Sequence, residues 1–230
     1  SGKTTSLYAG LKMLNRPDVK IVTVEDPIEY QIDGINQIQT QASIGLSFAK
    51  ILRSILRHDP DIIMIGEIRD LETALIAVQA ALTGHLVIST IHTNSAISTI
   101  ARLTDMGIDE YLIASTLEGV VAQRLIRKLC PDCKAEQNQR THHTIRGIRT
   151  FEPTGCDKCN NTGYIGRSVI SETLTISEDI RSAIVKNSPA SDISEIAIRE
   201  GFEDLFQSGL KKVEVGQTSL SEIYRVTDRN

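Results

Sequence analysis

Four cysteines form the clearest chemical pattern in the sequence. They occur as two C-x-x-C pairs, Cys130/Cys133 and Cys156/Cys159, joined by a polar loop. Two such pairs supply four thiolates to a tetrahedral Zn²⁺, and because four protein ligands fill the site, the metal is structural. The alternative is a redox disulfide, but no βαβ redox context lies nearby. We therefore predict a zinc site, for which His142 and His143 of the loop could compete as ligands.

The first residues could bind phosphate. The stretch Ser1-Gly2-Lys3-Thr4-Thr5 matches the end of the phosphate-binding loop G-x-x-x-x-G-K-[ST], so we expect further residues upstream. The helix predicted over Thr4–Asn15 would direct free N–H groups and its positive dipole end at an anion. Lys3 would reach the β- and γ-phosphates, and the Thr4 hydroxyl would hold Mg²⁺. An ordinary capped helix start explains the same residues equally well when this stretch is taken alone.

Acidic or titratable side chains follow three predicted strands. Glu25 and Asp26 follow the strand over 20–24, Glu67 follows the strand over 61–65, and His92 follows the strand over 86–91. In open α/β sheets, ligands bind outside the carboxyl ends of the strands. We therefore expect these side chains to share one sheet edge with the phosphate loop.

Glu67 is the predicted catalytic base, because an acid after an apolar strand could orient and deprotonate the attacking water. Gly66 stands where this pattern usually has an Mg²⁺-binding aspartate. Glu25, Asp26 and Glu29 form a cluster suited to water-mediated coordination of Mg²⁺. Simpler explanations exist for both features, namely a solvated acid before a helix for Glu67 and a strand-ending turn for Asp26-Pro27.

Three further side chains could contact phosphate. His92 could sense a γ-phosphate by hydrogen bonding, although a lone histidine is often a satisfied partial-core residue. Arg53 and Arg57 lie four residues apart on the polar face of a predicted helix. Most such arginines are solvated charges, and a role as arginine fingers requires them to face a phosphate in this or a neighbouring subunit.

The elements that must position these residues predict an α/β fold with a parallel sheet, because short β-branched runs alternate with helical patterns. Beyond the strands already named, helices are expected at 47–58, 71–82, 95–106 and 109–129. All four cysteines lie in a loop-rich insert, and from Val169 onward the chain is expected to be mostly helical, ending with Ser219–Val226.

Composition excludes some classes of function. The net charge is −4, so charge gives no reason to expect nucleic acid or an anionic membrane as the main partner. Aromatic residues make up 4% of the chain, too few for stacking platforms. No apolar run approaches the roughly 18 residues that a membrane-spanning helix needs.

Taken together, the motifs resemble those of the bacterial ATPases of type II secretion and type IV pilus assembly. Ser1–Thr5 resembles the Walker A motif, V-T-V-E-D-P-I-E-Y around Glu25 the Asp box, I-M-I-G-E-I-R-D around Glu67 the Walker B motif, and T-G-H-L-V-I-S-T-I-H-T before Asn94 the His box. The two cysteine pairs resemble the tetracysteine element of the secretion members, and G-Q-T-S-L-S-E-I-Y-R-V-T resembles the family's last helix.

The resemblance implies a RecA-like P-loop ATPase that uses ATP and Mg²⁺, carries Zn²⁺, and works as a homohexamer. It implies a RecA-like core over 1–129, a zinc subdomain over 130–167 and a helical subdomain over 168–230. It also implies a place at the cytoplasmic face of the inner membrane, through recruiting membrane proteins, and no nucleic-acid partner. Carried over, Ser1–Thr5 bind phosphates and Mg²⁺, Glu67 is the catalytic acid, Glu25 and His92 assist, and Arg53 and Arg57 match arginines of the nucleotide region.

The motifs are compatible with three functions. The first is a motor for type II secretion, and the second is a motor that assembles type IV pili, with E-D-P-I-E-Y, D-M-G-I and C-P-D-C favouring the first. The third, from another class, is a zinc-ribbon nucleic-acid-binding module on a degenerate ATPase scaffold, which the acidic balance and scarce aromatics argue against. The family's preceding domain is not in this sequence, so we expect the chain as given to bind nucleotide weakly.

Overall fold

The computed structural model describes residues 2–136 and 149–227. The chain divides into two compact units, each described by itself. The sheet unit comprises Lys3–Val120 and Leu174–Ala197, and the cysteine unit comprises Ser1–Gly2, Val121–Thr173 and Ile198–Asn230. No helix among the described residues is both long and apolar enough to cross a bilayer.

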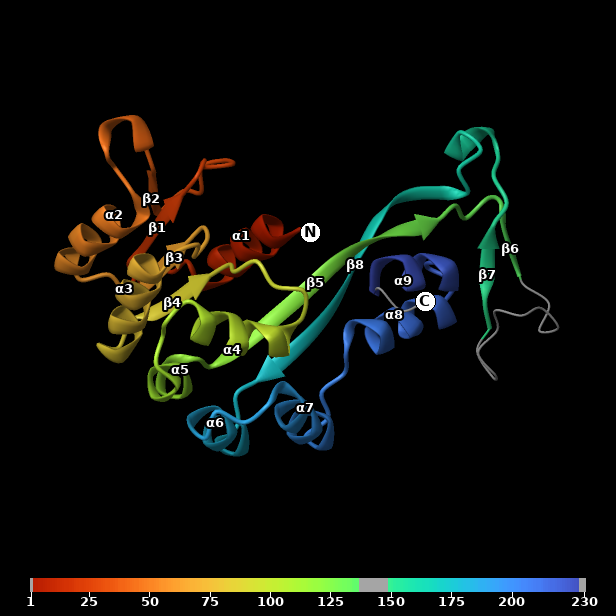
Figure 1. The fold of residues 1–230 in the computed structure, drawn as a ribbon. Coiled ribbons are helices and arrows are strands. Elements are labelled where there is room, and N and C mark those ends of the chain that lie inside the picture. Colours follow the sequence, from red (N-terminus) through yellow and green to blue (C-terminus); the bar gives the residue numbers. More distant parts are fainter. Residues whose placement is uncertain (1, 137–148, 228–230) are drawn as a thin grey trace. The chain divides into compact units, whose positions relative to one another are not determined.

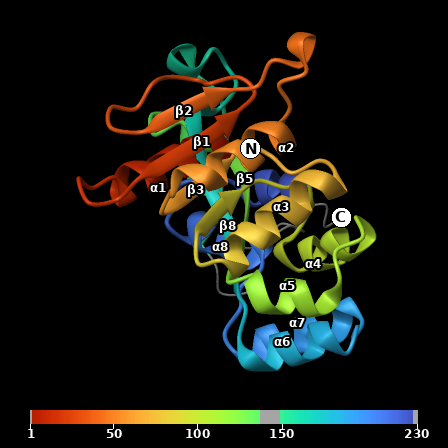
Figure 2. The same ribbon diagram turned by 90° about the vertical axis from the view of Figure 1, so that its left-hand side faces the viewer.

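The sheet unit is an α/β layer structure (Figures 1 and 2). Its strands β1, β2, β3 and β4 form one sheet in the order β2-β1-β3-β4, and every neighbouring pair is parallel. This confirms the predicted fold class. The elements are α1 (Lys3–Leu14), β1 (Ile21–Glu25), β2 (Asn36–Gln39), a 3₁₀ turn (Ala42–Ile44), α2 (Phe48–Ile55), a 3₁₀ turn (Leu56–His58), β3 (Ile62–Ile65), α3 (Leu71–Leu82), β4 (Leu86–Ser89), α4 (Ala96–Asp105), α5 (Glu110–Thr116), α6 (Glu178–Val185) and α7 (Ala190–Arg199).

Helices cover the sheet on both faces. On one face, alternate residues of β1 and β3 pack with α2 and α3 in a cluster that includes Val24, Ile65 and Leu52. On the other face, Tyr8 and Leu11 of α1 pack against the remaining apolar residues of these strands. Burial on both faces explains why every residue of β3 is apolar and why β1 is apolar except for the buried Thr23 and Glu25.

Polar caps fix where the helices begin. Asp70 accepts a hydrogen bond from the backbone N–H of Thr73 at 2.8 Å and so starts α3 directly after Glu67 and its neighbours. Ser95 and Ser98 form a reciprocal capping box at the start of α4. Each cap satisfies N–H groups that a helix start otherwise leaves without a partner. The caps therefore limit the loops after β3 and β4 to a few residues.

The cysteine unit is built on a long two-stranded ribbon, β5 with β8, whose strands run in opposite directions (Figure 1). Helices α8 and α9 pack on it through Ile126, Ile170, Val213 and Ile223. A small antiparallel pair, β6 with β7, adjoins the cysteines. The elements are β5 (Gly119–Leu129), β6 (Lys134–Glu136), β7 (Phe151–Pro153), a 3₁₀ turn (Asp157–Cys159), β8 (Tyr164–Thr175), α8 (Leu205–Glu214) and α9 (Leu220–Thr227).

One sequence prediction about this region is wrong. The helix expected over 109–129 ends at Thr116, and Gly119–Leu129 forms strand β5 instead. The part after Val169 is mostly helical, as predicted, although β8 continues to Thr175 before the first of these helices begins. Pairing of β5 with β8 buries Ile126 and Ile170 against α8 and α9, and this tertiary contact outweighs the helical pattern of the isolated segment.

A buried carboxylate ties α9 to this ribbon. Glu222 of α9 is fully buried and accepts hydrogen bonds from the Arg127 side chain at 2.6 and 3.0 Å, and from the Arg127 backbone N–H at 2.9 Å. Arg225 donates two more, both at 2.8 Å. Burial by itself would raise the pKa of Glu222, but the hydrogen bonds from Arg225 and Arg127 outweigh it and lower the pKa to about 2.

We predict that Glu222→Gln lowers the free energy of unfolding by roughly 2 kcal/mol, because hydrogen bonds to a charged group are lost inside the protein. The folded-state pKa is below its ordinary value of 4.5. The ionised group therefore contributes its full stabilisation above pH 4.5, and this contribution disappears as the pH falls toward about 2. Urea unfolding of wild type and variant across this window measures both effects.

The matched control is Glu214→Gln, because Glu214 is exposed on α8. Its unfolding free energy should equal that of wild type at every pH. Equal stability of Glu222→Gln and wild type at neutral pH would contradict the structural role given to this carboxylate.

Candidate nucleotide and metal sites

The four cysteine side chains come together in the cysteine unit. All four sulfur atoms lie within 4.8 Å of one another. Three Sγ–Sγ distances are 3.9 Å (Cys130–Cys156), 3.8 Å (Cys133–Cys159) and 3.8 Å (Cys156–Cys159). Four sulfurs around a tetrahedral zinc at about 2.3 Å would be about 3.8 Å apart. The donor set and its spacing therefore fit zinc.

Backbone N–H groups around these sulfurs favour thiolates. The Sγ of Cys159 accepts hydrogen bonds from the N–H groups of Cys156 and Gly163, each at 3.2 Å. Burial raises the pKa of Cys159, but these backbone hydrogen bonds outweigh it and lower the pKa to about 6. Gly163 has a φ of 74° and packs against Pro153 so closely that an added Cβ would overlap it. A glycine is required here to bring the N–H to the sulfur.

We predict that Cys133→Ser reduces the zinc content from about one ion per chain and lowers the melting temperature, because one of four thiolates is lost. Elemental analysis and thermal denaturation measure the two quantities. Lys158→Gln is the control, because Lys158 lies between the second pair of cysteines, pairs with Asp132 at 2.8 Å and supplies no thiolate. Unchanged zinc content and stability in Cys133→Ser would count against the four-thiolate site.

In the sheet unit, Glu67 lies just beyond β3 and is the centre of a charged cluster. One carboxylate oxygen of Glu67 lies 2.5 Å from a guanidinium nitrogen of Arg69, and the other lies 3.2 Å from His92 Nε2. The Glu67 side chain is 13% exposed, so it is enclosed yet reachable. The hydrogen bond from Arg69 lowers the pKa of Glu67, and burial opposes this only in part. Glu67 is therefore an ionised carboxylate that can accept a proton.

The phosphate-loop lysine lies at the same edge. Lys3 Nζ donates a hydrogen bond of 2.8 Å to the carbonyl oxygen of Ile91, the residue before His92. The structure thus brings the first turn of α1 to the segment that follows β4. Gly2 has a φ of 79°, in the left-handed region that favours glycine, as the end of a phosphate loop requires. Ser1 lies outside the described residues.

Glu25 ends β1 but does not extend into solvent. It is 3% exposed, and its two carboxylate oxygens accept hydrogen bonds from Tyr8, from Thr23 Oγ1 at 2.6 Å and from Gln37 Nε2 at 3.0 Å. Burial and the hydrogen bond to Glu25 raise the pKa of Tyr8 to about 12, so the phenol stays protonated and donates. The carboxylate is thus held in one orientation by three donors.

The remaining predicted residues are exposed. Asp26, Glu29, Thr4 and Thr5 have accessible side chains near the ends of β1 and α1. Arg57 is exposed at the end of the helical segment of α2. Arg53 pairs with Glu72 of α3 at 2.6 Å, with both side chains more than half exposed. Within the sheet unit, then, neither arginine is hydrogen-bonded to Glu67 or Lys3 in any contact that the structure describes.

Sequence reasoning missed three side chains of the cluster. Arg69 contacts Glu67, and Tyr8 and Gln37 contact Glu25. Arg69 stands two residues after the predicted base, so its position beside an acid was a usable signal. Gln37 lies on β2, a short polar strand whose pattern gave no indication of a strand. Tyr8 is one apolar position in a helix, and only packing reveals its hydroxyl contacts.

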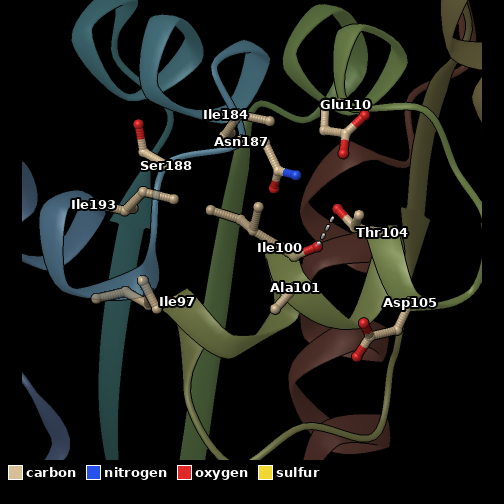
Figure 3. A pocket seen from close by; sticks show the side chains of 11 residues that line it. Ile97, Ile100, Ala101, Thr104, Asp105, Glu110, Ile184, Asn187, Ser188 and Ile193 are labelled. Carbon is tan, nitrogen blue, oxygen red and sulfur yellow. Dashed lines mark hydrogen bonds between the residues drawn. The ribbon is translucent and has the colours of Figure 1, made fainter.

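A separate hollow of about 150 Å³ lies among α4, α5, α6 and α7 of the sheet unit (Figure 3). Ile100 and Ile193 contribute apolar lining, and Asp105 and Glu110 contribute carboxylates. None of the predicted nucleotide or metal residues lines it. The hollow therefore does not belong to the edge of the sheet that carries Glu67.

The parallel sheet, the glycine–lysine–threonine start of α1 and the acid after β3 define a P-loop nucleotide-binding protein of the α/β class. Comparison with known proteins gives the family. The family model described as Type II/IV secretion system protein matches residues 1–225. The chain belongs to this family.

Individual relatives agree with this assignment. The type II secretion system ATPase E of Vibrio cholerae is 50% identical over 234 residues, covering 99% of this chain and 46% of that protein. The type IV pilus assembly ATPase PilB of Thermus thermophilus is 47% identical over 232 residues, covering 97% of this chain and 26% of that protein. The chain therefore spans less than half the length of these relatives.

Among solved structures, the pilus retraction motor PilT with bound ADP superimposes with a TM-score of 0.72 at 30% sequence identity. The match covers 98% of this chain and 58% of that one. The predicted resemblance to the secretion and pilus ATPases is confirmed.

Proposed function

We propose that this chain is the catalytic part of an ATP-hydrolysing motor that powers type II protein secretion. The observation that carries the proposal is the ionised Glu67 at the carboxyl edge of the sheet, on the same edge as the phosphate-loop lysine. The relatives named as secretion and pilus ATPases support the same activity. The reaction is attack of water on the γ-phosphorus of ATP, which releases ADP and phosphate.

Glu67 would act on the attacking water. Its carboxylate would accept a proton from the water as the new P–O bond forms and the bond to the ADP oxygen breaks. Arg69 and His92 hold the two carboxylate oxygens and so fix the direction of proton transfer. With its side chain 13% exposed, Glu67 is reachable from solvent but largely shielded from it.

Nucleotide and metal would bind around the first turn of α1. Ser1, Gly2, Lys3, Thr4 and Thr5 would contact the phosphates through backbone N–H groups, hydroxyls and the Lys3 ammonium. Magnesium would neutralise developing negative charge on the phosphates. The exposed Thr4 hydroxyl and the exposed carboxylates of Asp26 and Glu29 are oxygen ligands of the kind that Mg²⁺ takes directly or through water.

We predict that Glu67→Gln lowers ATP turnover by about 100-fold or more, because general-base catalysis is lost. Binding of ATP should persist, since glutamine keeps the shape of the side chain. Turnover and nucleotide binding are measured separately on the complete protein that carries this sequence.

Glu195→Gln is the matched control, because Glu195 is an exposed acid on α7 remote in sequence from every predicted site residue. It should match wild type in both assays. Equal turnover of wild type and Glu67→Gln would overturn the assignment of the base and return the nucleic-acid-binding alternative to consideration. That alternative predicts salt-dependent binding to DNA.

We further propose that the motor works as a homohexamer at the cytoplasmic face of the inner membrane. Membrane proteins of the secretion system would recruit it, and it would drive assembly of the pseudopilus. In a ring, Arg53 and Arg57 could reach a nucleotide held by a neighbouring subunit, because both are exposed on one helical segment. Loss of turnover on dilution below the hexamer, with recovery on concentration, would support this arrangement.

The second candidate is a motor for type IV pilus assembly, favoured by the 47% identity to PilB. We predict that deleting the gene abolishes secretion of folded enzymes and leaves pili intact. Enzyme activity in culture supernatants and electron microscopy of pili measure the two outcomes. Intact secretion with lost pili would favour the second candidate over the first.

A further inference from the structure

The hydroxyl of Tyr8 is the junction of four segments in the sheet unit. It donates a hydrogen bond to Glu25 Oε2 at the end of β1. It also accepts hydrogen bonds from the backbone N–H of Glu29 at 3.2 Å and from Gln37 Nε2 of β2 at 3.4 Å. Tyr8 itself is fully buried on α1, five positions after Lys3. One phenol thus links the helix of the phosphate loop to the acidic loop and to two strands.

Ring contacts reinforce this link. The rings of Tyr8 and Tyr30 meet edge to face with centroids 4.6 Å apart. Lys12 Nζ, one turn further along α1, lies 5.1 Å from the centre of the Tyr30 ring. Gln37 Nε2 also donates to the carbonyl oxygen of Tyr30 at 3.2 Å. The first part of the loop after β1, up to Tyr30, is therefore attached to α1 through Tyr8 and Lys12.

This loop follows the carboxyl end of β1 and carries two exposed carboxylates. Asp26 and Glu29 lie in it, and Glu25 immediately precedes it. A buried carboxylate such as Glu25 needs donors to stay in place, and Tyr8 is the donor that comes from the phosphate-loop helix. Without the phenol hydroxyl, Glu25 keeps Thr23 and Gln37 but loses its contact with α1.

From this geometry we propose that Tyr8 is a positioning residue for nucleotide and magnesium. Its hydroxyl holds the Glu25 carboxylate and the acidic loop in register with the first turn of α1. The inference rests on the proposed nucleotide site, and it adds a residue that acts through Glu25 without contacting the nucleotide. Removing the hydroxyl weakens Mg²⁺-dependent nucleotide binding more than it lowers the free energy of unfolding.

The test uses the complete protein and the variant Tyr8→Phe, which keeps the ring against Tyr30 and removes only the hydroxyl. We expect kcat to fall about tenfold, the size of effect that one lost hydrogen bond to a charged group produces. KM for ATP should stay within about twofold. The Mg²⁺ concentration that half-saturates binding of the fluorescent analogue mant-ATPγS should rise several-fold.

Tyr30→Phe is the matched control. Tyr30 is the other ring of the pair and is half exposed, and its hydroxyl makes no hydrogen bond to the described residues. It should bind mant-ATPγS with the Mg²⁺ dependence of wild type. A kcat and a Mg²⁺ dependence of Tyr8→Phe equal to those of wild type would overturn the proposal.

A double-mutant cycle separates positioning from general damage. If Tyr8 acts through the Glu25 carboxylate, Tyr8→Phe should shift the Mg²⁺ dependence less in a Glu25→Gln background than in wild type. Shifts that simply multiply would show independent effects and contradict the proposal. If Tyr8→Phe fails to fold, Thr23→Val takes its place, because it removes another donor to Glu25 without changing the shape of the side chain. An unchanged Mg²⁺ dependence in Thr23→Val would overturn the proposal that donors to Glu25 position the acidic loop.

Because binding of mant-ATPγS does not require hydrolysis, the role of Tyr8 can be tested separately from the proposed ATPase activity. A wild-type protein that binds mant-ATPγS with Mg²⁺ but never hydrolyses ATP would contradict the motor. The Tyr8→Phe comparison would still decide whether Tyr8 positions the acidic loop.

Discussion

The parallel pairing of β1, β3 and β4 is the constraint on which the nucleotide site depends. Parallel strands place all of their carboxyl ends at one edge, and burial on both faces fixes their register. Val24 pairs with Ile65 and Ile65 with Ser89, so the segments after them emerge side by side. Glu67 can meet His92 only because of this register. A slip of one residue would turn the apolar side chains of β3 to the wrong faces.

The sheet also explains why Gly66 precedes the predicted base. Gly66 donates its N–H to the carbonyl oxygen of Val24 at 2.7 Å. An added Cβ would lie 3.3 Å from that same oxygen and 3.4 Å from Glu25 Cα, tighter than most contacts of a side chain. A side chain here would require the neighbouring backbone of β1 to shift by a few tenths of an ångström. Asp26, Glu29 and Thr4, near the ends of β1 and α1, offer exposed oxygen ligands in place of an aspartate at this position.

The two acids of the edge have different environments. Glu67 is held by the exposed side chains of Arg69 and His92, and the hydrogen bond from Arg69 lowers its pKa, so the carboxylate is ionised and reachable. Glu25 is held by three neutral donors in the interior, so it serves as an anchor for the acidic loop. Every buried side-chain nitrogen and oxygen of the described residues has a hydrogen-bond partner. In the cysteine unit, two backbone N–H groups donate to the sulfur of Cys159 and so favour its thiolate form.

The sequence by itself determined the α/β class, the edge on which the acids lie, and the four cysteines that gather into a donor set fit for zinc. These features are local: apolar runs predict buried strands, acids follow them directly, and two C-x-x-C pairs supply their own ligands. The division of the chain into parts at 129/130 and 167/168 stays a prediction. Only the tertiary structure decided that Gly119–Leu129 is a strand, that Arg69 binds Glu67, and that Tyr8 and Gln37 hold Glu25. Strand β5 and the contacts of Tyr8 and Gln37 depend on partners from distant parts of the chain, and the Arg69 contact depends on side-chain orientations that the sequence does not specify. The free energy that decides them comes from packing and hydrogen bonding in the folded state.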